Sequence, residues 1–116
     1  MALCDAIDHP RVGVTIDTFH ANIEEKDLPQ AISSAGRRLK HVHASENDRG
    51  LLGSGHVDFP GIIRTLREIG YSGSLMIEGF GYSPEETTAP GALWADIHVS
   101  PADIAFQGAQ YLASLR

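Results

Sequence analysis

Three short apolar runs in this chain each end in a residue that can bind a metal ion or move a proton. They span residues 12–17, 39–43 and 74–78, and their last residues are Asp17, His43 and Glu78. Runs of this length, rich in valine, isoleucine and leucine, are typical of buried β-strands. Because the carboxyl ends of parallel strands face one crevice, we expect these three side chains to converge. The pattern therefore predicts a parallel sheet with a polar site at one edge.

Segments with helical spacing alternate with the strands. Helix-start signals open three of them: Asp27 with Pro29, Asp58 with Pro60, and Ser100 with Pro101 and Asp103. A capping side chain accepts hydrogen bonds from the N–H groups of the first turn, and proline there costs no hydrogen bond. Residues 2–7 resemble the end of a further helix, stopped before Pro10. We predict an α/β protein of parallel (β/α) repeats, with about three strands and three to four helices.

Two long segments follow the second and third strands, over residues 44–56 and 79–99. Each is too long for a simple turn, and loops at this edge of a sheet commonly carry function. Within the first segment we interpret Glu46 as a residue that holds its own loop and His56 as loop structure. In the second, Phe80 and Trp94 are interpreted as packing residues.

The composition excludes several classes of protein. A hydrophobic content of 42% is ordinary for a globular protein, and the net charge of −6 argues against a nucleic-acid partner. Cys4 is the single cysteine, so no intrachain disulfide can form, and we expect a reducing, cytoplasmic location. No run approaches the ~18 apolar residues of a membrane span, so no membrane partner is expected.

The three strand-end residues suit a particular kind of chemistry. Two carboxylates and one imidazole suit Mn²⁺, Mg²⁺ or Co²⁺ better than metals that prefer thiolates. Such a cation can stabilise an enediolate while a carboxylate removes a proton beside a carbonyl group. The alternative roles are a helix cap for Asp17 and a paired core carboxylate for Glu78. His41 shares a strand face with His43, and we expect it to lie behind that ligand, buried and hydrogen-bonded.

Four motifs in order resemble the sugar isomerase and epimerase members of the xylose-isomerase-like TIM barrels, in particular the ketose 3-epimerases of the D-tagatose 3-epimerase type. The motifs are Asp17-Thr-Phe-His20, His41-Val-His43, Glu46-Asn-Asp-Arg49-Gly50 and Glu78-Gly-Phe80. The resemblance covers nearly the whole chain. It implies that residues 1–116 form a single partial TIM-barrel domain, the C-terminal segment of a larger barrel from about the sixth strand to the eighth helix.

The resemblance also implies roles for individual residues. Asp17, His43 and Glu78 would bind the metal, and Glu78 would be one of two carboxylates that remove and return a proton at C3. His20 and Arg49 would contact the oxygens of a small-molecule sugar. The other carboxylate of the family comes from a preceding strand, which this chain lacks. We therefore expect the isolated chain to be inactive, and to form a homo-oligomer or to pair with an N-terminal half.

Two other functions fit the same residues. The first is a truncated or split product that does not catalyse and acts as an interaction module. The second is an apurinic-site endonuclease-like metal hydrolase, a branch of the same superfamily that carries an additional Asp-x-His metal pair. In this chain the corresponding loop has the reversed order, with His56 before Asp58.

Overall fold

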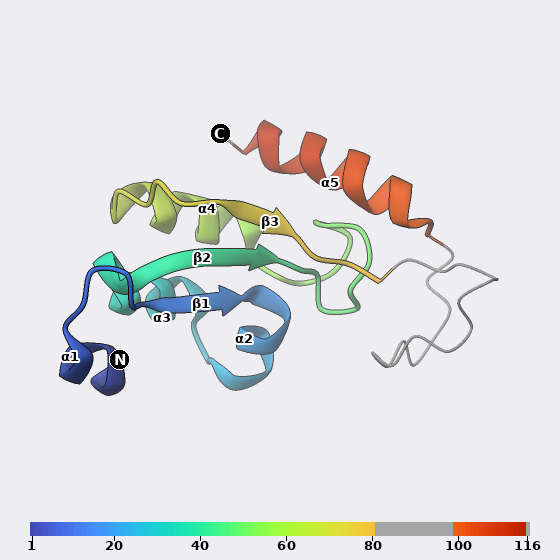
Figure 1. The fold of residues 1–116 in the computed structure, drawn as a ribbon. Coiled ribbons are helices and arrows are strands. Elements are labelled where there is room, and N and C mark those ends of the chain that lie inside the picture. Colours follow the sequence, from blue (N-terminus) through green and yellow to red (C-terminus); the bar gives the residue numbers. More distant parts are fainter. Residues whose placement is uncertain (81–98, 116) are drawn as a thin grey trace.

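A computed structural model describes residues 1–80 and 99–115 of the chain (Figure 1). The elements in chain order are α1 (Ala2–Ile7), β1 (Val14–Asp17), α2 (Thr18–Glu24), α3 (Leu28–Ala35), the 3₁₀ turn η1 (Gly36–Arg38), β2 (Leu39–Ala44), α4 (Phe59–Glu68), β3 (Leu75–Ile77) and α5 (Pro101–Ser114). Within these described ranges, no helix has the length and apolar character needed to span a membrane.

The three strands form one parallel sheet in the order β1-β2-β3, which confirms the predicted α/β class of parallel (β/α) repeats. All three arrows point the same way in Figure 1. β1 begins at Val14 rather than at residue 12, because Val14 is the first residue that pairs with β2. β3 ends at Ile77, so Glu78 follows the strand directly. β1 and β3 are thus shorter than predicted, while β2 continues one residue beyond His43 to Ala44. The carboxyl ends of the strands lie where the sequence indicated.

The register of the strands divides their side chains between two faces. Thr15 lies opposite His41, Asp17 opposite His43, and His43 opposite Met76, so these five residues share one face. Helices α3 and α4 cover the other face. Among the described residues no helix or strand covers the shared face, and Met76 is 53% exposed.

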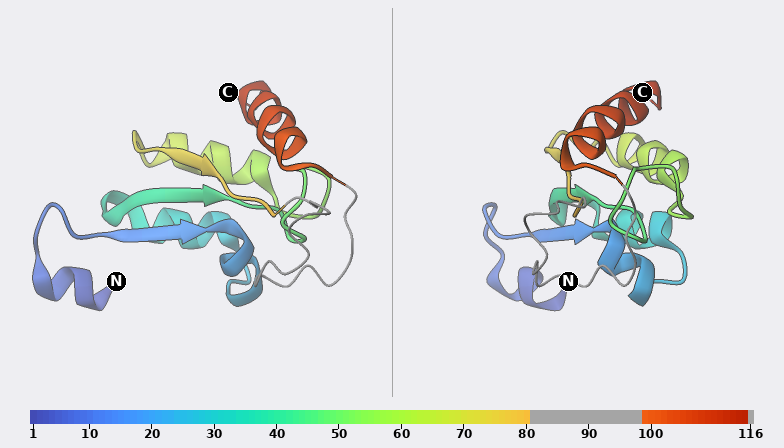
Figure 2. Two further views of the ribbon diagram at one scale, coloured as in Figure 1. Left: turned by 45° about the vertical axis from the view of Figure 1, so that its right-hand side comes forward. Right: turned by 90° about the vertical axis from the view of Figure 1, so that its right-hand side faces the viewer.

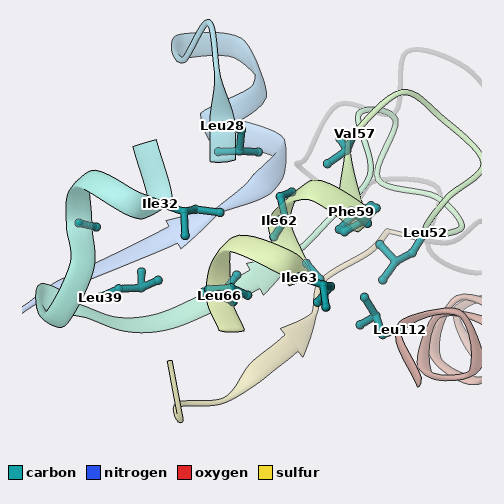
Figure 3. Close-up of a cluster of buried hydrophobic side chains, with 13 residues drawn as sticks. Leu28, Ile32, Leu39, Leu52, Val57, Phe59, Ile62, Ile63, Leu66 and Leu112 are labelled. Atoms are coloured by element: carbon teal, nitrogen blue, oxygen red, sulfur yellow. The ribbon is translucent and has the colours of Figure 1, made fainter. Parts of the chain in front are cut away.

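The core lies between the sheet and helices α3 and α4 (Figure 3). Its buried members come from α3, β2, the loop after β2, α4 and α5: Leu28, Ile32, Ala35, Leu39, Val42, Ala44, Leu52, Val57, Phe59, Ile62, Ile63, Leu66 and Leu112. Ile32, Val42 and Phe59 are fully excluded from solvent. Burying such side chains stabilises the fold by about 1.5–3 kcal/mol each.

The predicted helix starts are found in the structure. The side-chain oxygens of Asp27, Asp58 and Ser100 accept hydrogen bonds from the backbone N–H groups of Gln30 at 2.9 Å, Gly61 at 3.0 Å and Asp103 at 3.1 Å. Gly70, just after the end of α4, has φ of +67°, a conformation that favours glycine.

Helices α2 and α5 each have a feature that local sequence signals do not display. α2 was not predicted, because its seven residues carry no apolar spacing, and it begins only because Asp17 caps it. On α5 the buried stripe is Ile104, Gly108 and Leu112, whereas Ala105 and Ala109 are exposed. A Cβ atom at Gly108 would lie 3.1 Å from Ile77, so the missing side chain lets α5 approach β3 closely.

The core assignment makes a direct prediction about stability. Ile32→Ala removes a fully buried side chain between α3 and the sheet, and we expect a loss of about 2–5 kcal/mol in the free energy of unfolding. The matched control is Ile23→Ala on α2, whose side chain is 66% exposed and whose loss should cost less than about 0.5 kcal/mol. Urea unfolding followed by circular dichroism measures both. Equal losses in the two variants would contradict the core described above.

Candidate active site

Asp17 joins β1 to α2 and uses its two carboxylate oxygens differently. Oδ1 accepts hydrogen bonds from the backbone N–H groups of Phe19 at 2.8 Å and His20 at 3.4 Å, and so caps α2. Oδ2 lies 3.7 Å from Nδ1 of His43, across the strand pair. The helix cap, which the sequence offered as the alternative to a metal-binding role, is thus present, while Oδ2 faces His43.

Asp17, His43 and Glu78 converge at the carboxyl ends of the three strands. Each offers one nitrogen or oxygen atom, and these three atoms all lie within 4.8 Å of one another. His43 Nδ1 also contacts Glu78 Oε2 directly. In the described part of the chain, this is the one group of three or more such residues close enough to hold a metal ion. The side chains are 14%, 31% and 29% exposed, so the cluster remains open to a ligand from the uncovered face of the sheet.

Arg49 supplies positive charge beside these carboxylates. Its Nη1 lies 3.0 Å from Glu78 Oε1 and 4.0 Å from Asp17 Oδ2. The arginine is only 8% exposed, although it lies in a loop. Its backbone φ is +62°, a left-handed conformation uncommon outside glycine. Backbone strain of this kind is typical of residues held in place at functional sites.

The guanidinium of Arg49 is also enclosed by aromatic rings and by His20. Its Cζ lies 4.0 Å from the ring centre of Phe19 and 4.8 Å from that of Phe80. Nη2 lies 3.0 Å from Nε2 of His20, and because a guanidinium only donates, this ring nitrogen is the acceptor. Nε of Arg49 is buried and has no hydrogen-bond partner among the described residues.

Glu46 organises the loop that carries Arg49. Its side chain is fully buried and accepts three backbone hydrogen bonds, from Asn47 at 3.1 Å, Val57 at 3.0 Å and Gly53 at 2.9 Å. These bonds confirm that Glu46 holds its own loop. Gly53 has φ of +82° and lies against the ring of Tyr111 on α5, which leaves no room for a Cβ atom. Burial, and then the negative charges of Glu46 and Asp58, raise the pKa of Tyr111 above its usual value.

The same loop is tied to α2 at two points. The hydroxyl of Thr18 donates to the backbone oxygen of Ser45 at 2.6 Å and accepts from the Ser45 N–H at 2.8 Å. Nε2 of His56 lies 3.2 Å from the side-chain amide of Asn22. His56 contacts Asn22, and Asp58 caps α4. His56 and Asp58 therefore do not form a second group of metal ligands among the described residues.

The sequence therefore indicated most residues of this site, and some of them behave differently from the expectation. Asp17, His43, Glu78, His20 and Arg49 lie together. His41 is half-buried and meets the His43 ring edge-on at 4.8 Å between centres, without the expected hydrogen bond among the described residues. Trp94 and most of the loop over residues 79–99 lie outside the described residues.

Sequence reasoning missed the roles of Phe19 and Thr18. Both lie in the Asp17-Thr-Phe-His20 motif, where an aromatic residue and a hydroxyl directly after a strand were the available signal.

The chain belongs to the xylose isomerase-like TIM barrel family, whose sequence profile matches residues 1–112. It is similar to a probable ketose 3-epimerase from Synechocystis sp., with 34% identity over 112 residues that cover 97% of this chain and 39% of the relative. It is also similar to a ketose 3-epimerase from Arthrobacter globiformis, with 37% identity over 102 residues that cover 83% of this chain and 35% of the relative.

Solved structures show the same relationship. A D-allulose 3-epimerase from Methylomonas sp. superposes with a TM-score of 0.84 at 30% identity, covering 99% of this chain and 41% of that structure. A D-psicose 3-epimerase from Clostridium cellulolyticum, determined with D-tagatose, gives a TM-score of 0.85 at 29% identity, covering 98% and 41%. The chain thus spans about two fifths of the length of these relatives, and its sheet is part of a TIM barrel.

The hydrogen bonds of Glu46 lead to a second prediction. Glu46→Gln replaces one acceptor oxygen with an N–H donor that faces backbone N–H groups, and we expect a loss of about 1–3 kcal/mol in stability. Hydrogen exchange at the amides of Gly53 and Val57 should become faster than in the unchanged chain. Glu68→Gln, at an exposed position of α4, is the control and should change neither measurement. Unchanged exchange at both amides in Glu46→Gln would contradict the role of the carboxylate.

Proposed function

We propose that this chain provides part of the active site of a metal-dependent ketose 3-epimerase, which acts by proton transfer through an enediolate. The observation that carries the proposal is the convergence of Asp17, His43 and Glu78, within 4.8 Å of one another, beside the buried Arg49. The names of the relatives support the substrate class.

The three converging residues fit a divalent cation. Asp17 and Glu78 offer carboxylate oxygens and His43 offers Nδ1, a set of donors that suits Mn²⁺, Mg²⁺ or Co²⁺. Mn²⁺ is our first choice. When bound, the cation would stabilise the negative charge that develops on the sugar oxygens.

Glu78 is proposed as the acid–base residue. Its Oε1 faces the Arg49 guanidinium at 3.0 Å, while Oε2 faces the imidazole of His43. The two oxygens thus have separate partners, so one can bind the cation while the other takes or returns the proton at C3. Inversion at C3 requires a second acid–base group on the opposite face of the sugar. We place that group in the part of the barrel that this chain does not include.

Arg49 and His20 are proposed to bind the sugar oxygens. Nη1 and Nη2 of Arg49 face Glu78 and His20, and each of these nitrogens carries a second N–H that can donate to a ligand. The Nε2 atom of His20 accepts from Arg49, which leaves Nδ1 as the N–H donor of the neutral ring. Both residues can therefore donate hydrogen bonds to hydroxyl or carbonyl oxygens.

Activity is proposed to need the rest of a barrel, from an N-terminal half or from another copy of the chain. Among the described residues, β1 and β3 each pair with a strand on one side only, with β2 between them. Beside β1, a groove of about 720 Å³ has an apolar floor that includes Val14, Ile16 and Ala21. An additional strand and helix would cover this edge and this groove. Without that complement, the chain would act as an interaction module that does not catalyse.

The two roles of Asp17 can be separated by substitution. Asp17→Asn keeps a side-chain oxygen for the α2 cap but removes the charge, whereas Asp17→Ala removes both. We expect both variants to lower Mn²⁺ affinity by at least about tenfold, since losing even an outer-sphere partner costs that much. Only Asp17→Ala should also lose about 1 kcal/mol of stability. Calorimetric Mn²⁺ titration and urea unfolding measure the two effects. Unchanged Mn²⁺ affinity in Asp17→Asn would contradict the metal role.

The epimerase proposal is tested by isotope exchange. The chain is purified alone and after co-expression with the N-terminal three fifths of the Synechocystis relative, and each sample receives Mn²⁺ and a panel of ketohexoses and ketopentoses in D₂O. We expect deuterium at C3 with the complex and none with the chain alone, because only the complex offers carboxylates on both faces. Nuclear magnetic resonance of the recovered sugar measures the incorporation.

The controls separate the two parts of the proposal. Glu78→Gln should abolish exchange in the complex, whereas Glu68→Gln on α4 should leave it unchanged. If a stable complex exchanges no ketose at C3, the epimerase assignment is wrong. If the chain alone turns over ketose at a rate typical of enzymes, the requirement for a complement is wrong.

A further inference from the structure

The strands begin at the left of the sheet in Figure 1 and in the left view of Figure 2. A second polar site lies at this end of the sheet. A cleft of about 250 Å³ separates the segment before β1 from turn η1 and the start of β2. The residues that line it are Asp8, His9, Pro10, Val12, Arg37, Arg38 and Lys40. Three of the nine lysine and arginine residues in an acidic chain therefore gather around one small cleft.

Backbone irregularities bring these cations together. Turn η1 places Arg37 and Arg38 in succession ahead of β2. The pairing of β1 with β2 then skips Lys40, since Val14 pairs with Leu39 while the next residue of β1 pairs with His41. A bulge of this kind redirects a side chain. The Lys40 side chain lies over Gly13, where a Cβ atom would come within 2.3 Å of its Cγ.

Arg38 lies at this cleft and pairs with two exposed carboxylates. Its Nε lies 3.1 Å from Asp5 Oδ1, and its Nη2 lies 3.3 Å from Asp8 Oδ1. The arginine side chain is only 13% exposed, whereas those of Asp5 and Asp8 are 59% and 82% exposed. The guanidinium is thus largely buried, and its partners are solvated carboxylates that bind it weakly.

His9 adds a neutral donor to the lining. Its Nδ1 accepts a hydrogen bond from the backbone N–H of Arg11 at 3.2 Å. The neutral ring therefore carries its proton on Nε2, which can donate to a ligand. Apart from Asp8, the charged side chains that line the cleft are cations, and His9 is a hydrogen-bond donor.

We propose that this cleft binds a small dianion of the phosphate class, either free phosphate or a phosphate monoester. A guanidinium matches two phosphate oxygens at once, and a lysine ammonium adds a point charge. The cleft can hold a phosphate group with part of its hydration shell. A long polyanion does not fit, because the rest of the chain carries a net negative charge that would repel it. This site is independent of the epimerase proposal, since it lies at the opposite ends of the strands.

The test is a titration of the 116-residue chain with inorganic phosphate and, separately, with methyl phosphate at constant ionic strength. We expect saturable shifts of the amide signals of Gly13, Gly36 and Lys40 in ¹⁵N–¹H spectra. Lys40→Gln and Arg37→Gln should each weaken binding by about tenfold. Arg64→Gln, on an exposed face of α4, removes the same charge elsewhere and should leave the affinity unchanged.

A variant that is expected to bind phosphate more tightly distinguishes an effect on the cleft from a loss of folding. Asp8 has φ of +43°, a conformation that asparagine tolerates, so Asp8→Asn removes a negative charge from the cleft without backbone strain. It should strengthen phosphate binding several-fold while Lys40→Gln weakens it. Tighter binding of methyl phosphate than of phosphate would identify a monoester as the ligand, and tighter binding of phosphate would identify the free ion.

Three results would overturn the proposal. They are the absence of saturable binding by either anion, an equal loss of affinity in Arg64→Gln and Lys40→Gln, and shifts confined to the residues around His43 at the other end of the sheet.

Discussion

The parallel pairing of β2 with both of its neighbours is the constraint on which the rest of this structure depends. It sets Asp17 opposite His43, and the pairing continues beyond β3 through a hydrogen bond of 2.9 Å from the Glu78 N–H to the Ala44 oxygen. Backbone hydrogen bonds alone thus bring two carboxylates and an imidazole together. A slip of one residue in either strand pair would turn a member of the cluster towards the helices.

Such a concentration of negative charge is tolerated because its surroundings balance it. Arg49 contributes a buried positive charge, and the backbone N–H groups at the start of α2 face one oxygen of Asp17. Arg49 is itself fixed from both sides, since the Phe80 N–H donates to its backbone oxygen at 2.9 Å and two aromatic rings enclose its guanidinium. Loop, helix and strand are therefore coupled through one side chain.

Local signals in the sequence explain which features could be predicted. Strand ends, helix caps and the ligand types at Asp17, His43 and Glu78 depend on neighbouring residues, and the sequence displays them directly. The burial of Arg49 depends on Phe19 and Phe80, which are distant in sequence and meet only after folding. Helix α2 was not predicted because its start depends on the Asp17 cap and its residues show no apolar periodicity. The close approach of α5 to the sheet at Gly108 depends on the position of β3, which the residues of α5 alone do not indicate.

The buried carboxylate of Glu46 has a consequence for the thermodynamics of binding. Ordering a flexible residue costs about 1–2 kcal/mol in backbone entropy. If the loop became ordered only when a ligand bound, this cost would reduce the free energy of binding. Here three backbone N–H groups are already bound to one side chain, so the loop between β2 and α4 is ordered in advance. A ligand that meets Arg49 encounters a preformed surface. Its binding should therefore have a small entropic penalty, and its change in heat capacity should reflect only the area of direct contact.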